Sequence, residues 1–251
     1  VVWVTCAHCT LFGQNCDGED SVIGRPMSQP SPGDGGQCPL TLIGTVYKAT
    51  PNFWVNQPAT TDTVAIRLIP GISVSTKICG TDSLPNGPVY LSGKYRVPNV
   101  GEAICKSGRT TGVQCGTVQS IHASAMVDYG CFTRQVDDVI ITTKILEPGD
   151  SGSIGFDPST GDFLGQGFAG SDSLAIFISP QQIHDVLHLV PYGGQSQSQP
   201  TPSPQPSGLS QLMCGVACGM ASALGCNCCY AMATKAGIWY RIKAFFKKIF
   251  K

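Results

Sequence analysis

Short runs rich in Val, Ile and Thr recur along the first 190 positions of the chain. They are separated by turn residues, a pattern typical of β-strands. Their spacing indicates an all-β sandwich or barrel rather than alternating βαβ units. Apolar residues at helical spacing near position 187 predict one short helix. The pattern predicts strands at residues 1–4, 40–48, 63–69, 112–122 and 139–146 and a helix at 181–189.

Composition divides the chain into three parts. Residues 1–190 are long enough to bury a substantial core as one domain. The chain as a whole is 42% hydrophobic and only 13% charged, with 30 Gly and 18 Pro. Residues 191–211 are rich in Pro, Gln and Ser and predict an extended linker. Residues 212–251 form a Cys-rich apolar segment followed by a predicted basic amphipathic helix.

The pentapeptide Gly-Asp-Ser-Gly-Ser at residues 149–153 is the main candidate for chemistry. A serine between glycines can occupy a tight turn, where the N–H groups of Gly149 and Ser151 would stabilise a developing oxyanion. Alone, such a sequence is more often a surface turn. Upstream, however, the chain offers His8 and Asp62. A histidine can act as the base that a serine nucleophile needs, and an aspartate can orient that histidine.

Three blocks resemble the chymotrypsin-like (trypsin-fold) serine peptidases: Ala-His-Cys at residues 7–9, Asp-Thr-Val-Ala-Ile at 62–66 and Gly-Asp-Ser-Gly at 149–152. Residues 106–118 are similar to microbial and phage-type members. The order His, Asp, Ser is the order that this fold uses. The resemblance covers residues 1–190 and implies a double six-stranded antiparallel β-barrel with a short C-terminal helix. It implies a serine endopeptidase in which His8, Asp62 and Ser151 form the triad and Gly149 and Ser151 form the oxyanion hole.

Details of this resemblance lead to further expectations. Residues 1–4 run straight into His8, so we expect the first barrel to lack its first strands. Asp150 is expected to make a local hydrogen bond, because no family-type amino terminus is present to pair with it. Arg109 is expected to be structural.

The substrate pocket follows from motif spacing. Its base is expected at Ile145 and Pro148, and its opposite wall at Ala169, Gly170 and Ser171. No aspartate occupies the base position, which holds Ile145 instead. The predicted preference is therefore for a small or apolar side chain before the cleaved bond.

Two other functions remain open from the sequence. The chain is alternatively a catalytically inactive binding or scaffold domain that keeps the peptidase fold, or a hydrolase of small esters. Convergence of the triad residues distinguishes the first of these from a peptidase. The histidines at positions 122, 184 and 188 lie outside any such motif and are assigned solvent or structural roles.

The 13 cysteines fall into two groups, eight before residue 190 and five between residues 214 and 229. Cys105 and Cys115 flank a turn and could pair across it, but the sequence does not determine the remaining connectivity. Zinc is an alternative for Cys6-x-x-Cys9 and for Cys226-x-Cys228-Cys229. Because a clean second CxxC pair is absent, we expect no metal and no cofactor. Oxidising surroundings are favoured for the domain.

The tail predicts association with a membrane. Residues 212–234 carry no charge over a length that could span a bilayer, and residues 238–250 follow with apolar and basic faces at helical period. Residues 212–251 hold six basic and no acidic residues, which leaves 10 basic and 16 acidic residues and a net charge of −6 for residues 1–211. The partners expected are protein or peptide substrates and a membrane surface, with no nucleic acid.

Several arrangements of the tail are compatible with the sequence. The tail could span the membrane with the peptidase on the extracellular side, which is favoured. It could instead fix a cytosolic peptidase to the inner leaflet through S-acylated cysteines. A disulfide-linked appendage, or a helix docked on the acidic domain, is the alternative without a membrane.

Overall fold

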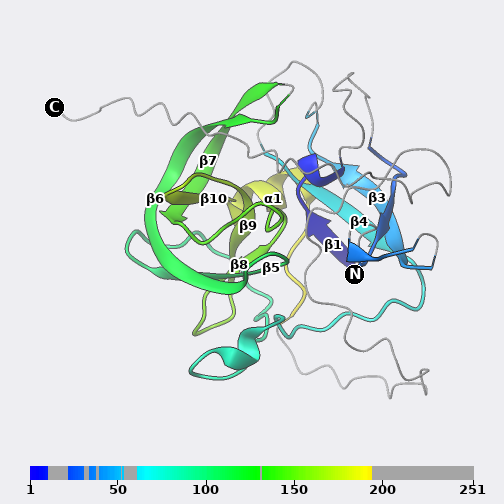
Figure 1. Ribbon diagram of the computed structural model, residues 1–251, viewed down its shortest axis with the longest axis horizontal. Helices are drawn as coiled ribbons and strands as arrows, with labels where there is room; N and C mark the ends of the chain where they lie inside the picture. The colour runs from blue at the N-terminus through cyan, green and yellow to red at the C-terminus, as the bar shows by residue number, and fades with distance from the viewer. Residues whose placement is uncertain are drawn as a thin grey trace.

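The computed structural model describes residues 1–10, 22–30, 34–37, 40–51, 53, 61–130 and 132–193. Within them the chain forms two antiparallel β units joined by a long connection (Figure 1). The predicted linker beyond residue 193 and the predicted tail helix lie outside the described residues. No helix among the described residues is long and apolar enough to cross a bilayer.

The first unit is a sheet of four described strands. Val46 pairs with Ile66 in this sheet, and both side chains are buried in its core. The order is β1-β4-β3-β2, so the sheet is open in the part that the structure describes. Its strands are β1 (Val2–Thr5), β2 (Pro26–Ser28), β3 (Leu42–Ala49) and β4 (Val64–Leu68).

The second unit is a closed six-stranded barrel in the order β10-β7-β6-β5-β8-β9. Closure pairs every strand on both sides and removes exposed edges. Together with the open sheet and one short helix, this barrel confirms the expected all-β fold. Its strands are β5 (Ala103–Gly108), β6 (Gly112–Asp128), β7 (Thr133–Thr143), β8 (Ile154–Phe156), β9 (Phe163–Gly170) and β10 (Leu174–Ile178).

Strand β6 is longer than predicted: the predicted strand ended at His122, whereas β6 continues to Asp128. His122 has φ 53°, and the pairing of β6 with β7 shifts register between Ser120 and Ala123. An irregularity of this kind bends a strand without ending it. The strand therefore continues around the barrel to Asp128, and β7 begins at Thr133 rather than at residue 139.

Helix α1 (Pro180–Leu187) closes the described fold. It begins at Ser179, whose hydroxyl accepts a hydrogen bond from the Gln182 N–H at 3.2 Å. Its last residue is Leu187, two residues before the predicted end at 189, and His188 beyond it takes a left-handed conformation. Lys48 of β3 donates to the Leu187 carbonyl at 2.8 Å, so the helix is fastened to the first sheet.

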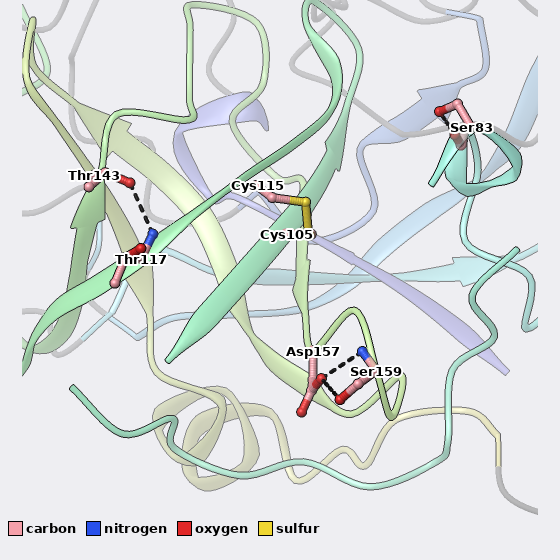
Figure 2. The surroundings of a disulfide bond; sticks show 8 residues. Ser83, Cys105, Cys115, Thr117, Thr143, Asp157 and Ser159 are labelled. Carbon is pink, nitrogen blue, oxygen red and sulfur yellow. Dashed lines mark hydrogen bonds between the residues drawn. A yellow bond between two sulfur atoms is a disulfide. The ribbon is translucent and has the colours of Figure 1, made fainter. Parts of the chain in front are cut away.

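The connection between the two units is anchored to the barrel by Arg96. Its guanidinium pairs with Glu102, Asp157 and Asp162. Although burial opposes the charge on Asp157, hydrogen bonds from Ser159 and Arg96 lower its pKa to about 2. Figure 2 shows Asp157 accepting bonds from the N–H and hydroxyl of Ser159 at the turn between β8 and β9.

Candidate active site

His8 and Asp62 meet because strands β1 and β4 pair. Thr5 lies opposite Val64 at the end of this ladder, so the residues just beyond it, His8 in a short 3-10 helix and Asp62 before β4, come together. The His8 N–H donates to Asp62 Oδ1 at 2.9 Å, and His8 Nδ1 forms a short contact with Asp62 Oδ2. Both side chains are buried. The carboxylate thereby fixes the orientation of the imidazole ring.

Two residues of the second barrel also hold Asp62. Tyr129 donates its hydroxyl proton to Asp62 Oδ2 at 3.1 Å, and the Gln166 amide donates to the Asp62 backbone carbonyl at 3.1 Å. Tyr129 lies between β6 and β7, and Gln166 lies on β9. Neither was predicted from the sequence, and no motif at either position could have identified it. The Asp62 site is therefore assembled from both β units.

Ser151 lies in a tight turn whose backbone leaves two N–H groups available. The N–H groups of Asp150, Gly152 and Ser153 donate to backbone carbonyls at 2.7–2.9 Å. Within the described part of the chain, the N–H groups of Gly149 and Ser151 donate no hydrogen bond. The two N–H groups left over belong to the residues expected to form the oxyanion hole, which needs donors that are not already bonded within the protein.

Gly149 has the left-handed backbone that the turn requires, with φ 94°. A Cβ at this position would lie 2.4 Å from Thr110 Oγ1. The Thr110 hydroxyl itself donates to the carbonyl of Pro148 at 2.8 Å. Both the conformation and the close approach of Thr110 therefore favour glycine here.

Asp150 holds the turn from inside through an ion pair with Lys106. Lys106 Nζ lies 2.8 Å from Asp150 Oδ2, and neither side chain is exposed. Asp150 also accepts from the N–H of Glu147 and from Thr110 and Thr111. Burial lowers the pKa of Lys106 and opposes the charge on Asp150, yet the bonds from Lys106 and Thr111 hold the pKa of Asp150 below its usual value. The expected local bond is present, but the ion pair was missed.

A disulfide bond fastens the hairpin that carries Lys106. Cys105 and Cys115 lie directly opposite each other on β5 and β6 and are bonded, as their positions on either side of a turn suggested (Figure 2). The next turn of the hairpin holds Arg109, which pairs with Asp34 at 2.8 and 2.9 Å. Arg109 thus has a structural contact, as expected, and the hairpin is braced at both ends.

The serine hydroxyl points along β9 in this structure. Ser151 Oγ donates to the carbonyl of Phe168 at 3.3 Å. The His8 segment nevertheless adjoins the turn, because Cys9 Sγ lies 3.8 Å from the Ser151 carbonyl oxygen. The structure therefore places His8 with Asp62 in a hydrogen-bonded pair and brings Ser151 to the neighbouring loop, with its hydroxyl bonded to Phe168.

Of the expected pocket residues, Ala169 and Gly170 end β9 and Ser171 follows it, whereas Ile145 and Pro148 precede the Ser151 turn. Ile145 and Ala169 are buried, Gly170 and Ser171 are partly exposed, and Pro148 is exposed. Ser171 is held by backbone and hydroxyl bonds to Leu174. Ile145 packs in the core cluster of the barrel and presents no charge.

The remaining described histidines make contacts away from this site. His122 contacts the Asp138 carboxylate on β7. His184 Nδ1 lies 3.0 Å from the Leu189 carbonyl, and its ring stacks on Tyr95. His188 ends helix α1. These contacts are compatible with the structural or solvent roles expected of them.

Cys6, His8 and Cys9 place potential metal-binding atoms within 4.8 Å of one another. Their chemistry does not suit a metal ion. Cys9 is disulfide-bonded, and His8 Nδ1 is engaged with Asp62. Burial and the nearby Asp62 charge raise the pKa of the Cys6 thiol, so it keeps its proton. This cluster lacks the thiolates that a zinc site needs.

An open β-sheet carrying a His–Asp pair, beside a closed barrel carrying a serine in a glycine turn, is the arrangement of the chymotrypsin-like serine peptidases. The resemblance stated from the three sequence blocks is confirmed at the level of fold. No protein-family model matches the chain.

Known proteins of this class resemble the chain. Streptogrisin-C of Streptomyces griseus is 32% identical over 106 residues, which are 40% of this chain and 22% of that protein. The match thus spans about a fifth of that relative's length. A solved glutamic-acid-specific serine protease with a histidine triad in substrate binding is 24% identical, with TM-score 0.51, over 76% of this chain and 86% of its own. The solved structure of Nocardiopsis protease is 18% identical, with TM-score 0.52, over 74% of this chain and 82% of its own.

Proposed function

We propose that the chain is a serine endopeptidase that cleaves peptide bonds through an acyl-enzyme. The observation that supports this most directly is the buried His8–Asp62 pair beside a turn in which Gly149 and Ser151 leave their N–H groups available. Both residues are partly exposed, so a ligand can reach these two donors. An anionic tetrahedral intermediate is such a ligand.

The proposed reaction uses these groups in two steps. Ser151 Oγ, released from the Phe168 carbonyl by rotation of its side chain, gives its proton to His8 and attacks the substrate carbonyl carbon. The carbonyl electrons move to oxygen, which Gly149 and Ser151 stabilise. His8 then protonates the leaving amine as the peptide bond breaks. Water repeats the sequence on the acyl-enzyme and restores Ser151. Asp62 holds His8 in the required tautomer throughout.

The proposed substrates have a small or apolar side chain before the cleaved bond. Ile145 and Pro148 would form the base of the pocket, with Ala169, Gly170 and Ser171 as the opposite wall. Buried Ile145 offers no charge to a basic or acidic side chain. A panel of otherwise identical peptides carrying Ala, Leu, Phe, Lys or Glu at this position tests the preference. Fastest cleavage after Lys or Glu would contradict it.

Labelling with a fluorophosphonate probe tests the reaction itself. The probe reacts only with an activated serine, so the parent chain is expected to be labelled and Ser151→Ala is not. Ser83→Ala is the matched control, because Ser83 is exposed and its hydroxyl bonds only the nearby Gly80 carbonyl at 2.9 Å. A folded parent that is not labelled would contradict the proposal and favour the inactive binding domain. The Ser151–Phe168 bond is the one observation that favours that alternative.

The tail is proposed to bring the peptidase to a membrane surface, on the extracellular side. The support is the sequence of residues 212–251, with its uncharged segment and basic amphipathic helix. Sedimentation of the full chain with vesicles of phosphatidylserine and phosphatidylcholine tests this. The double variant Lys247→Glu/Lys248→Glu is expected to bind less, whereas Lys77→Glu/Lys94→Glu in the domain is not. If the parent and both variants bind the vesicles equally, the basic face of the tail helix does not contribute to membrane binding.

A further inference from the structure

We propose that Tyr129 is a positioning residue for the His8–Asp62 pair, acting through the hydrogen bond from its hydroxyl to Asp62 Oδ2. This inference rests on the proposed function, since the pair would serve the attack by Ser151. The 3.1 Å bond joins the second β unit to a carboxylate of the first, across 67 positions of sequence.

The Asp62 carboxylate is wholly buried, so its charge needs donors. Oδ1 accepts from the His8 backbone N–H, and Oδ2 accepts from both His8 Nδ1 and the Tyr129 hydroxyl. Two of these donors belong to the histidine itself. Tyr129 is the donor that fixes the carboxylate independently of His8, and therefore sets the direction in which Asp62 presents its charge to the imidazole.

Tyr129 is suited to donate and not to accept. Burial raises the pKa of its phenol, and the nearby charge of Asp62 raises it further, so the hydroxyl stays protonated. Among the described residues, the other ionisable groups that face this cluster are Cys6, whose thiol is also held protonated, and Arg134 of β7. Arg134 lies over the rings of Phe53 and Phe132 at 5.4 and 5.2 Å.

The tyrosine ring is itself held on several sides. The Tyr129 N–H donates to the Phe132 carbonyl at 2.9 Å across the hairpin tip. Its ring meets Phe53 edge-on at 5.3 Å and Phe132 at 5.1 Å. The His8 ring lies 5.7 Å away. A side chain packed in this way loses little further freedom when it orients Asp62, which is what a preorganised site requires.

Tyr129→Phe tests the proposal because it removes the hydroxyl and keeps the ring. Removing a donor leaves the Asp62 charge more concentrated, so Asp62 holds protonated His8 more tightly. Since the reaction needs neutral His8, the acid limb of the kcat/KM profile is expected to move to higher pH. We expect kcat to fall about tenfold, with KM nearly unchanged, as for loss of a hydrogen bond to a charged group.

Phe132→Leu is the matched control. It disturbs the same aromatic cluster, but a hydrocarbon side chain donates no hydrogen bond to Asp62. It is expected to lower the unfolding midpoint without moving the acid limb. An acid limb in Tyr129→Phe that coincides with the parent, or one that moves equally in Phe132→Leu, would reduce Tyr129 to a packing role.

A second variant works in the opposite direction and covers failure of Tyr129→Phe to fold. Difluorotyrosine at position 129 is a more acidic donor and should move the acid limb to lower pH. The proton NMR signal of His8 Nδ1, assigned by its loss in His8→Gln, reports the same midpoint without substrate. If the parent is not labelled by the probe but this midpoint still moves with the donor at 129, only the proposed function fails. If the parent is labelled and the midpoint does not move, only the role of Tyr129 fails.

Discussion

Lys106 and Asp150 form an ion pair at 2.8 Å beneath the Ser151 turn, with both side chains fully buried. Lys106 comes from β5, and Asp150 directly precedes the candidate nucleophile. The carboxylate also accepts the Glu147 N–H at the start of the same turn. This pair therefore ties the shape of the turn, and with it the direction of the Gly149 and Ser151 N–H groups, to the barrel wall.

Lys106→Met is expected to destabilise the domain and to stop labelling of Ser151. Removing the cation leaves Asp150 as an unpaired buried charge, which costs about 3–5 kcal/mol. Urea unfolding measures the free energy of unfolding. The rate at which the fluorophosphonate probe labels Ser151 reports whether the turn keeps its shape. Lys94→Met is the control, because Lys94 is exposed.

The double variant Lys106→Met/Asp150→Leu separates stability from function. An apolar pair removes the unpaired buried charge and is expected to restore part of the lost free energy of unfolding, although the N–H groups of Glu147, Thr110 and Thr111 lose their acceptor. Labelling should stay low, because the bonds from Glu147, Thr110 and Thr111 to the carboxylate are gone. Full labelling in this double variant would show that the ion pair does not shape the turn.

Gly149→Ala is expected to slow labelling of Ser151 by about a hundredfold or more, as for loss of one oxyanion donor. The new Cβ would approach Thr110 Oγ1 to 2.4 Å and would strain a backbone at φ 94°. Gly71→Ala is matched in conformation, with φ 91°, but its Cβ would meet nothing within 4 Å. It isolates backbone strain from the clash. Equal labelling of the two variants would contradict the oxyanion role.

The pair Cys105→Ala/Cys115→Ala is expected to lower the free energy of unfolding by about 2–3 kcal/mol, since the disulfide closes a short loop. Because that loop carries Lys106, Thr110 and Thr111, the variant should also label more slowly than the parent. Urea unfolding and labelling rates at a temperature where both proteins are folded check the two effects. An unchanged labelling rate would show that the β-ladder alone holds the hairpin.

Asp157 should make the free energy of unfolding of the domain depend on pH in the acid range. Its pKa in the folded state is about 2, below the value near 3.9 of an unfolded aspartate. A depressed pKa contributes stability that is complete above the unfolded value and is lost as pH falls toward 2. Asp157→Asn is therefore expected to flatten the dependence of the urea midpoint on pH between about 4 and 2. Asp172→Asn, at an exposed carboxylate, should leave that slope unchanged.

Local patterns in the sequence predicted much of this molecule. Runs rich in Val, Ile and Thr identified β3 and β4 closely, and helical spacing identified α1 to within two residues at each end. The blocks around His8, Asp62 and Ser151 pointed to the residues that the structure brings to one region. The positions of Cys105 and Cys115 on either side of a turn suggested the disulfide bond between them. In each case the information lies within a few neighbouring positions, because backbone periodicity, turn chemistry and side-chain reactivity are local properties.

What the sequence did not reveal depends on residues that meet only after the strands pair. Lys106 and Asp150 are 44 positions apart, and Tyr129 and Asp62 are 67. Nothing near Lys106 or Tyr129 marks either as the partner of a buried carboxylate. The register of β5 with β6 and the hairpin after β6 decide these contacts, and register is set by packing over the whole barrel. The sequence by itself thus determined the fold class and the candidate chemical groups, whereas the tertiary structure decided which side chains orient and neutralise them.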